Sequence, residues 1–354
     1  MSARIEIDLD AFRHNVRTLA ALAAPARTML AVKADGYGHG MLPIARASLE
    51  SGADSLAVLD VPAALAIRAA GIDAQVFAWL HGKETDFRAG IEAGVDLGVS
   101  SLTELRRIAD AGVASVHLKI DTGLHRNGAS PEDWPELVRA TLDLQEAGRV
   151  RLAGLWSHLA DASPDDDAAA LAEFRAAIAV AAGIGVPMAG PDRPLLHLAA
   201  SSAGIRMPAA RFDLVRFGIA AYGVSPFDDV DARGLGMRAP MTVTAEIVRL
   251  HGDYAVLGIG SADGLPPTAT PDAPSGQGAE VLLGDRRAGV FVIHVDETFV
   301  GATRHDQVGD VAVIYGPGDH GEPTAEDWAR WAATIGDEIL ARASTRIPRV
   351  YLNE

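Results

Sequence analysis

The chain has 354 residues and a formal net charge of −16, from 47 acidic and 31 basic side chains. Its composition, 49% hydrophobic and 22% charged, is typical of a globular protein that folds as two domains or as one large barrel with an appendage. The acidic balance disfavours nucleic acid and anionic membranes as partners. The absence of cysteine excludes disulfides, thiolate nucleophiles and cysteine-ligated zinc, and we predict no metal site.

The N-terminal segment shows no targeting signal. Residues 1–8 lack the basic stretch followed by an apolar run that marks a signal peptide. The longest apolar helical run, at 176–186, is too short to cross a bilayer. We therefore expect a cytoplasmic protein that binds no membrane.

The first 225 residues repeat one theme, in which a short apolar run is followed by a turn and a helical pattern. The predicted strands are 29–33, 55–60, 75–80, 95–99, 115–120, 151–156, 195–199 and 213–217. Strands that alternate with helices favour a parallel sheet, and eight of them are the number in a (β/α)₈ barrel. A doubly wound open sheet is the alternative.

Amphipathic stretches between these runs predict helices over 101–111, 131–147 and 165–182. Ser101 and Glu104 form a capping-box pattern, and the pair Ser130-Pro131 suits a helix start.

After about residue 230 strands follow one another with few helices between them. They are predicted at 241–250, 254–259, 280–283, 289–295 and 311–315, with a loop over 266–278, one helix over 324–341 and a short terminal strand. We predict an α/β protein with a barrel over 1–230 and a mostly β domain over 231–354. Residues 1–10 are expected to pair with the second domain.

Lys33 ends an apolar strand and enters a glycine-rich loop that runs to Gly40. The carboxyl ends of barrel strands form the active face, where partial desolvation favours the neutral amine that attacks a carbonyl group. The glycines allow the backbone to approach a ligand. Alternatively, Lys33 extends to the barrel rim and pairs with Asp35.

These residues resemble the cofactor-lysine signature of the alanine racemases, which depend on pyridoxal phosphate. The segments 31–34 and 37–40 match at every fixed position, and 6–15 resembles the family's opening strand and helix. The resemblance extends along nearly the whole chain. It implies a barrel with a C-terminal β domain, pyridoxal phosphate bound by Lys33 with Tyr37 beside it, and a homodimer whose active sites take groups from both subunits.

Arg126 matches the family's arginine near the phenolic oxygen of the cofactor and the substrate carboxylate, because a guanidinium can donate to both. Lys119 matches a lysine that is carbamylated in some members and then holds this arginine. Without the resemblance, a loop arginine paired with Asp121 explains Arg126 equally well.

His158, at the end of the sixth predicted strand, matches the family's active-site histidine, although a lone histidine is more often structural. Ser202 matches the serine that meets the phosphate, while Ser201 stands where asparagine is usual.

Arg216 matches the arginine that faces the pyridine nitrogen, where a cation limits side reactions. A buried pair with Asp213 is the alternative. The amides of Gly218 and Ile219 suit a phosphate, and Tyr222 is also assigned to the cofactor.

The second half of the site departs from the family. Racemisation needs a proton-transfer group on each face of the substrate's Cα atom, and in the family these are the cofactor lysine and a tyrosine of the partner subunit. Ser261 replaces this tyrosine, and the preceding stretch 249–256 is shorter than usual. Asp337 replaces a tyrosine near the phosphate, and Val295-Asp296 replaces a Met-Asp pair near the substrate. His158, with an ordinary histidine pKa, is the expected substitute base, directly or through water.

Three functions remain open. The first is an amino-acid racemase, acting on alanine or another amino acid, with Ser261 in place of the tyrosine. The second is pyridoxal phosphate chemistry on one face only, such as aldol cleavage, elimination or decarboxylation. The third is a cofactor-binding protein with little turnover. The absence of cysteine argues against the related diamino-acid decarboxylases, which use one near the second face.

Overall fold

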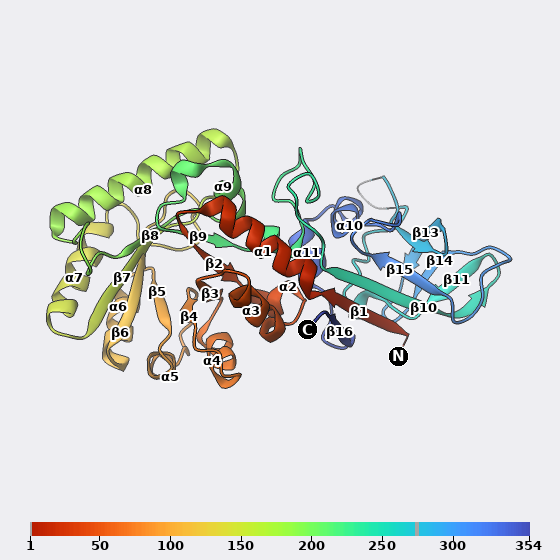
Figure 1. Ribbon diagram of the computed structural model, residues 1–354, viewed down its shortest axis with the longest axis horizontal. Helices are drawn as coiled ribbons and strands as arrows, with labels where there is room; N and C mark the ends of the chain where they lie inside the picture. Colours follow the sequence, from red (N-terminus) through yellow and green to blue (C-terminus); the bar gives the residue numbers. More distant parts are fainter. Residues whose placement is uncertain (1, 273–275) are drawn as a thin grey trace. The chain divides into compact units, whose positions relative to one another are not determined.

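A computed structural model describes residues 2–272 and 276–354 (Figure 1). The chain forms two units. The barrel unit comprises Arg17–Lys33 and Ser48–Gly218, and the C-terminal unit comprises Met1–Val16, Ala34–Ala47 and Ile219–Glu354. Within the described ranges, no helix is both long and apolar enough to cross a membrane.

The barrel unit contains an eight-stranded parallel sheet in the order β8-β7-β6-β5-β4-β3-β2-β9. Its strands are β2 (Arg27–Ala31), β3 (Ser55–Val58), β4 (Gln75–Ala78), β5 (Asp96–Val99), β6 (Ala114–Lys119), β7 (Val150–Trp156), β8 (Leu195–His197) and β9 (Leu214–Phe217). The eight predicted strands are therefore confirmed, with ends that differ by at most two residues.

Hydrogen bonds join the two outer strands and bring the sheet close to a closed barrel. The amide of Asp213 donates to the carbonyl of Leu196 at 3.0 Å, and the amide of Arg216 donates to that of Ala199 at 3.0 Å. Side chains alternate across a strand, so every second residue points into the barrel. Met29, Ala57, Phe77, Trp156 and Leu214 form a buried cluster there.

Helices surround this sheet, and Figure 1 shows α4 to α8 outside the strands. They are α4 (Val61–Ala69), α5 (Phe87–Glu92), α6 (Leu102–Ala111), α7 (Trp134–Glu146), α8 (Pro164–Ile184), α9 (Ser201–Arg206) and the 3₁₀ turn η1 (Pro208–Ala210); α1 (Leu9–Ala23) spans the division between the units. As predicted, the Ser101 hydroxyl caps α6 by accepting from the amide of Glu104 at 3.2 Å. α7 begins three residues later than predicted, because residues 131–133 form a turn first.

The C-terminal unit is built on a mostly antiparallel sheet in the order β11-β14-β13-β12-β15-β10-β1-β16, and β11 also pairs with β10. Its strands are β1 (Ala3–Asp8), β10 (Met241–His251), β11 (Tyr254–Leu257), β12 (Glu280–Leu283), β13 (Arg286–Ile293), β14 (Thr298–Gly301), β15 (Val311–Tyr315) and β16 (Arg349–Leu352). β1 pairs antiparallel with β10 and parallel with β16. The predicted loop over 266–278 includes residues 273–275, which lie outside the described residues.

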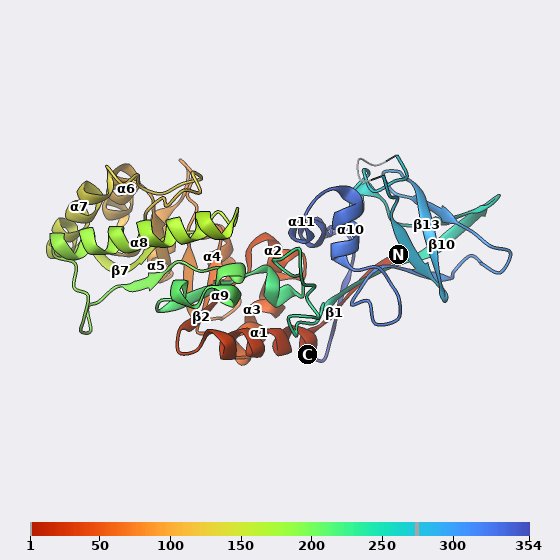
Figure 2. The ribbon, with the colours of Figure 1, turned by 90° about the horizontal axis from the view of Figure 1, so that it is seen from above.

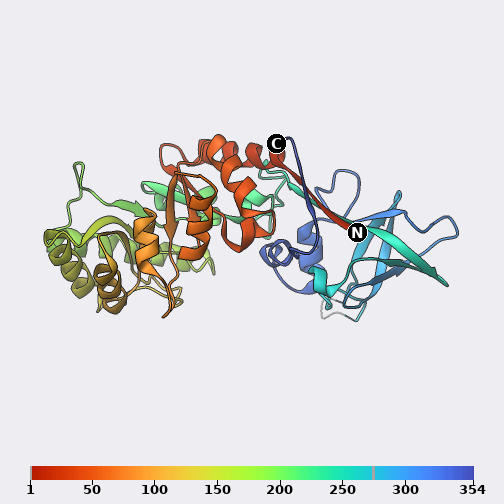
Figure 3. The same ribbon diagram turned by 90° about the horizontal axis from the view of Figure 1, so that it is seen from below.

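Two short helices replace the single helix predicted over 324–341. α10 (Ala325–Ala332) and α11 (Gly336–Ala341) are separated at Ala333, which has a φ of 53°. Figures 2 and 3 show both helices beside the sheet, and the Trp328 indole donates to the carbonyl of Ile314 at 2.7 Å. The remaining elements of this unit are α2 (Lys33–Tyr37), whose first residue belongs to the barrel unit, α3 (Met41–Glu50), whose last three residues belong to the barrel unit, η2 (Ile219–Tyr222) and η3 (Ser261–Asp263).

Candidate functional site

Basic side chains gather at the carboxyl ends of the barrel strands. Their combined effect is seen at His158, which follows β7: burial and four positive charges hold its pKa well below the usual value. The four charges belong to Arg216, Arg126, Lys119 and Lys33. The sequence-predicted residues of the barrel unit thus form one electrostatic cluster, which favours an anionic ligand.

Arg216 is the most fully bonded of these cations. Its guanidinium donates to Nδ1 of His197 at 3.0 Å and to Nδ1 of His158 at 3.1 Å. It also donates to the backbone carbonyls of Ser157 and Leu198, at 2.8 and 3.0 Å. Four acceptors on a buried side chain fix the plane of the guanidinium.

The charge of Arg216 is retained at neutral pH. Burial and the positive charge of Arg126 lower its pKa to about 9. Asp213, which sequence reasoning offered as the alternative partner, instead binds Arg193 at 2.8 Å. The guanidinium of Arg216 is therefore held mainly by neutral acceptors.

His158 is held in one tautomer. A guanidinium can only donate, so Nδ1 of His158 accepts from Arg216 and the proton of the neutral ring lies on Nε2. Its lowered pKa corrects the expectation of an ordinary histidine pKa. In this arrangement Nε2 donates a hydrogen bond and cannot accept a proton.

Lys119 is buried at the end of β6. Its ammonium donates to the amide oxygen of Asn127 and lies 5.0 Å from the centre of the Trp156 ring. Burial, then the charges of Arg126 and Arg216, lower its pKa to about 8. A substantial fraction of Lys119 is therefore neutral near pH 8.

Two serine side chains lie at the start of α9. Ser201 and Ser202 are buried, and the Ser201 hydroxyl accepts from the amide of Gly218 at 3.1 Å. Gly204 allows this helix to pack closely on β9, since a Cβ there would lie 2.7 Å from Cγ1 of Val215. Of the two hydroxyls, that of Ser201 is thus placed directly at the Gly218 amide.

The segment after Lys33 has a backbone conformation that is rare for L-residues. Ala34, Asp35, Gly36 and Tyr37 all lie in the left-handed region, with φ between 48° and 61°. Each non-glycine residue there costs about 1–2 kcal/mol, and such strain is concentrated at functional sites. Asp35 stabilises the turn by accepting from the amide of Met41 at 2.8 Å.

Tyr37 and Tyr222 meet in the C-terminal unit, with ring centroids 4.6 Å apart. Both phenols are buried, and His39 packs against Tyr222 at 5.0 Å. Burial and then the carboxylate of Asp337 raise the pKa of Tyr37. Asp337, one of the departures in the sequence, therefore lies in electrostatic range of a predicted cofactor residue.

Ser261 and Val295 lie on adjacent loops of the C-terminal unit. The amide of Ser261 donates to the carbonyl of His294 at 2.8 Å, and the following amide donates to the carbonyl of Val295 at 2.9 Å. Asp296 lies 3.2 Å from Arg346. The structure thus places the predicted residues of the C-terminal unit in two separate neighbourhoods, Tyr37 with Tyr222 and Ser261 with Val295.

The shortened stretch 249–256 forms a tight hairpin. His251 pairs with Tyr254 across the two-residue turn between β10 and β11, and Gly252 has a φ of 60°. Glycine is favoured at this position because the turn requires a positive φ.

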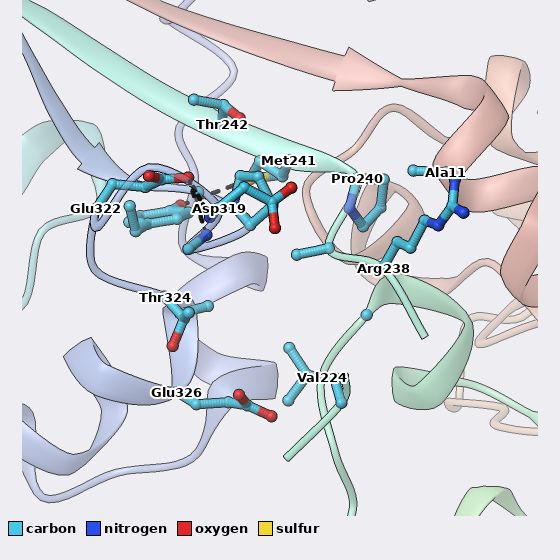
Figure 4. Close-up of a pocket in the computed structure, with 18 of the residues that line it drawn as sticks. Ala11, Val224, Arg238, Pro240, Met241, Thr242, Asp319, Glu322, Thr324 and Glu326 are labelled. Carbon is cyan, nitrogen blue, oxygen red and sulfur yellow. Dashed lines mark hydrogen bonds between the residues drawn. The ribbon is translucent and has the colours of Figure 1, made fainter. Parts of the chain in front are cut away.

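A cleft of about 770 Å³ lies elsewhere in the C-terminal unit. Glu322, Thr324, Glu326, Val224 and Arg238 line it together with Tyr222 (Figure 4). Glu322 accepts hydrogen bonds from the backbone amides of residues 318–320, so this carboxylate stabilises the adjacent loop. Of the predicted site residues, only Tyr222 borders this cleft.

Sequence reasoning missed the role of His197, the buried acceptor of Arg216. Its position at the end of β8, on the inward-pointing side, was the available signal. It also missed His117, whose Nδ1 lies 2.9 Å from Nε2 of His197.

Known proteins resemble the chain over its full length. The family models for the N-terminal and C-terminal domains of alanine racemase match residues 7–226 and 245–351. The alanine racemase of Thermobifida fusca is 40% identical over 378 residues, covering 99% of this chain and 98% of that protein. Two solved alanine racemases, from Streptomyces coelicolor and Streptomyces lavendulae, have TM-scores of 0.93 and 0.92 at 38% and 36% identity, each covering 100% of this chain and 98% of its own.

Proposed function

The chain belongs to the alanine racemase family, and we propose that it interconverts the L and D forms of alanine, or of another amino acid, with pyridoxal phosphate held by Lys33. This family consists of isomerases that depend on pyridoxal phosphate. The observation that carries the proposal is the cluster of basic side chains around His158 at the active face of the barrel unit.

The donor set fits the cofactor. The Lys33 amine matches its aldehyde, and the Arg216 guanidinium matches its ring nitrogen. Tyr37, Tyr222 and Ser202, with the amides of Gly218 and Ile219, match its phosphate. The four charges that act on His158 are all positive, as an anionic ligand requires. When bound, pyridoxal phosphate withdraws electrons from the Cα atom of an amino acid, so that its proton is more easily removed.

Proton transfer on the first face of the substrate's Cα atom is assigned to Lys33, whose amine removes or returns the Cα proton. Arg126 binds the substrate carboxylate, and Val295 and Asp296 border the substrate bound by the neighbouring subunit. Carbamylated Lys119 would add a negative charge that holds Arg126 in place. These assignments follow the family motifs residue by residue.

The second face is assigned to an oxygen, either the hydroxyl of Ser261 of the partner subunit or a water. His158 donates from Nε2 to this oxygen, because Arg216 occupies Nδ1. Donation to an oxygen favours its deprotonated form, which can then accept the Cα proton. A serine hydroxyl is much less acidic than a phenol, whose pKa is about 10, so we expect a slow second-face transfer.

The proposal also includes the oligomeric state of the protein and its location in the cell. We expect a cytoplasmic homodimer with shared active sites, and sedimentation of the cofactor-loaded protein tests the dimer. The C-terminal unit carries Ser261, Val295 and Asp296 together, as a contribution to a neighbouring site requires.

Chiral chromatography of L-alanine incubated with the loaded protein tests the activity. We expect D-alanine to accumulate until the two enantiomers are equal. Lys33→Ala should lose about 10²–10⁴-fold or more of the rate, because it removes a proton-transfer group as well as the cofactor attachment. A protein that binds the cofactor but racemises no amino acid supports one-face chemistry or a binding protein instead.

A further inference from the structure

A row of buried ionisable side chains crosses the interior of the barrel unit. Asp96 begins β5, His117 lies in β6, His197 ends β8 and Arg216 lies in β9. Their exposed fractions are 6%, 0%, 0% and 7%. Barrel interiors are usually filled by branched apolar side chains. The proposed function uses Arg216 alone, so the other three residues require an explanation.

The hydrogen bonds in this row have a fixed direction, which Arg216 sets. Its guanidinium can only donate, so Nδ1 of His197, 3.0 Å away, accepts. Burial, then the positive charge of Arg216, lower the pKa of His197 well below its usual value, which keeps the ring neutral. Its single ring proton therefore lies on Nε2 and is donated to Nδ1 of His117 at 2.9 Å.

The direction continues to a carboxylate. Because Nδ1 of His117 accepts, its ring proton lies on Nε2, which faces Oδ2 of Asp96 at 3.5 Å, an electrostatic contact that is too long for a hydrogen bond. Oδ2 of Asp96 also accepts a hydrogen bond from the side-chain amide of Gln75 at 2.5 Å. Burial alone would raise the pKa of Asp96, but the polar contacts with His117, then Ser115 and Gln75, hold it well below the usual range. The row therefore starts at a cation and ends at an anion.

Aromatic packing and one glycine hold the two imidazoles in place. Trp156 stacks on His197 with an interplanar angle of 4°, and Phe77 lies 4.8 Å from His117, centroid to centroid. A Cβ on Gly154 would lie 2.1 Å from Nδ1 of His117. Glycine at this position leaves room for the bond between the two histidines.

We propose that Asp96, His117 and His197 are positioning residues for Arg216, which hold its guanidinium in one orientation and connect it to a buried negative charge. The inference rests on the proposed function, in which Arg216 faces the ring nitrogen of the cofactor. The three residues touch neither substrate nor cofactor. They act by fixing the group that does.

Two substitutions of Asp96 separate the effect of its negative charge from the effect of its oxygen atoms. Asp96→Asn keeps an oxygen acceptor for His117, whereas Asp96→Leu removes the acceptor as well. With Asp96→Leu we expect kcat to fall about tenfold, since the buried negative charge that faces the His117 Nε2–H at 3.5 Å is lost at the end of the row. KM should change little, and Asp96→Asn should restore much of kcat.

Nitrogen-15 NMR of the histidine rings supplies a readout that is independent of turnover. In the cofactor-loaded protein we expect His117 and His197 to be neutral, with the proton on Nε2 of both. Gly154→Ala should shift both sets of ring signals, whereas Gly183→Ala, which meets nothing within 4 Å, should not.

A proton on Nδ1 of His197, or unchanged kcat and ring signals in folded Asp96→Leu, would overturn the proposal. If the protein racemises no amino acid but the predicted tautomers are found, the proposed function fails while the directed row stands.

Discussion

Ser261 is the residue at which the proposed chemistry is most easily altered. Its backbone is fixed by the bond from its amide to the carbonyl of His294, so the position is held while the side chain is free to vary. We expect Ser261→Tyr to raise kcat for racemisation by about 10²-fold or more, because a phenol is a far better proton-transfer group than a serine hydroxyl. Ser261→Phe is the matched control. An equal gain in the phenylalanine variant would show that the ring, and not the hydroxyl, was missing.

Lys119 is expected to react with carbon dioxide. Its pKa of about 8 provides neutral amine, and the neighbouring charges of Arg126 and Arg216 stabilise a carbamate anion. Carbon-13 NMR in labelled bicarbonate should show a carbamate signal that disappears in Lys119→Arg. A signal that survives the substitution would place the carbamate on another amine.

The sequence identified the residues that stand at strand ends, because the carboxyl edge of a parallel sheet is predictable from the order of strands. Lys33 and His158 were singled out in this way, whereas Arg216 was assigned from the family resemblance. His117 and His197 were not assigned roles. Their contact depends on how the curled sheet brings β6 and β8 together across its interior, and no local pattern records that.

At the scale of elements, the break between α10 and α11 offers a test of backbone strain. Ala333 is exposed and has a φ of 53°, which is unfavourable for alanine but not for glycine. We expect Ala333→Gly to raise the free energy of unfolding by about 0.5–1 kcal/mol, measured by denaturant titration. Ala176→Gly, at an exposed position inside α8, should instead lower it by about 1 kcal/mol. A loss of stability in Ala333→Gly would contradict the assigned backbone conformation.

The same break shows the limit of pattern reading. The helical pattern over 324–341 is continuous, and the left-handed residue that divides it carries no glycine or proline signal. β14 was missed as well, because only two of its four residues, Phe299 and Val300, have large apolar side chains. The barrel strands were predicted well, since each is a distinct apolar run followed by a turn.

At the scale of the whole molecule, buried neutral histidines should control stability in acid. Burial lowers the pKa of His39 and of His81 to about 4, and those of His158 and His197 lie well below the usual value. Below about pH 6.5 the unfolded chain gains protons that the folded chain does not. The free energy of unfolding should therefore fall between about pH 6.5 and 4, by about 1.4 kcal/mol per pH unit for each such histidine.

Urea titrations at several pH values measure this slope. His39→Gln should reduce the slope of the unfolding free energy against pH by about 1.4 kcal/mol per pH unit, which corresponds to one proton. His251→Gln, at an exposed position, is the control and should leave the slope unchanged. An identical slope in His39→Gln and in the parent chain would show that this histidine is not held neutral.

The most direct test of the central claim is to incubate L-alanine with the cofactor-loaded protein in D₂O, separate the enantiomers by chiral chromatography and record the proton NMR spectrum of each. A racemase exchanges the Cα proton on both faces, so deuterium should appear at Cα in both enantiomers, and the exchange should disappear in Lys33→Ala. Deuterium confined to the L enantiomer, for alanine and for every other amino acid tried, would contradict the racemase assignment and leave chemistry on one face. An unaltered exchange in Lys33→Ala would contradict the role of Lys33.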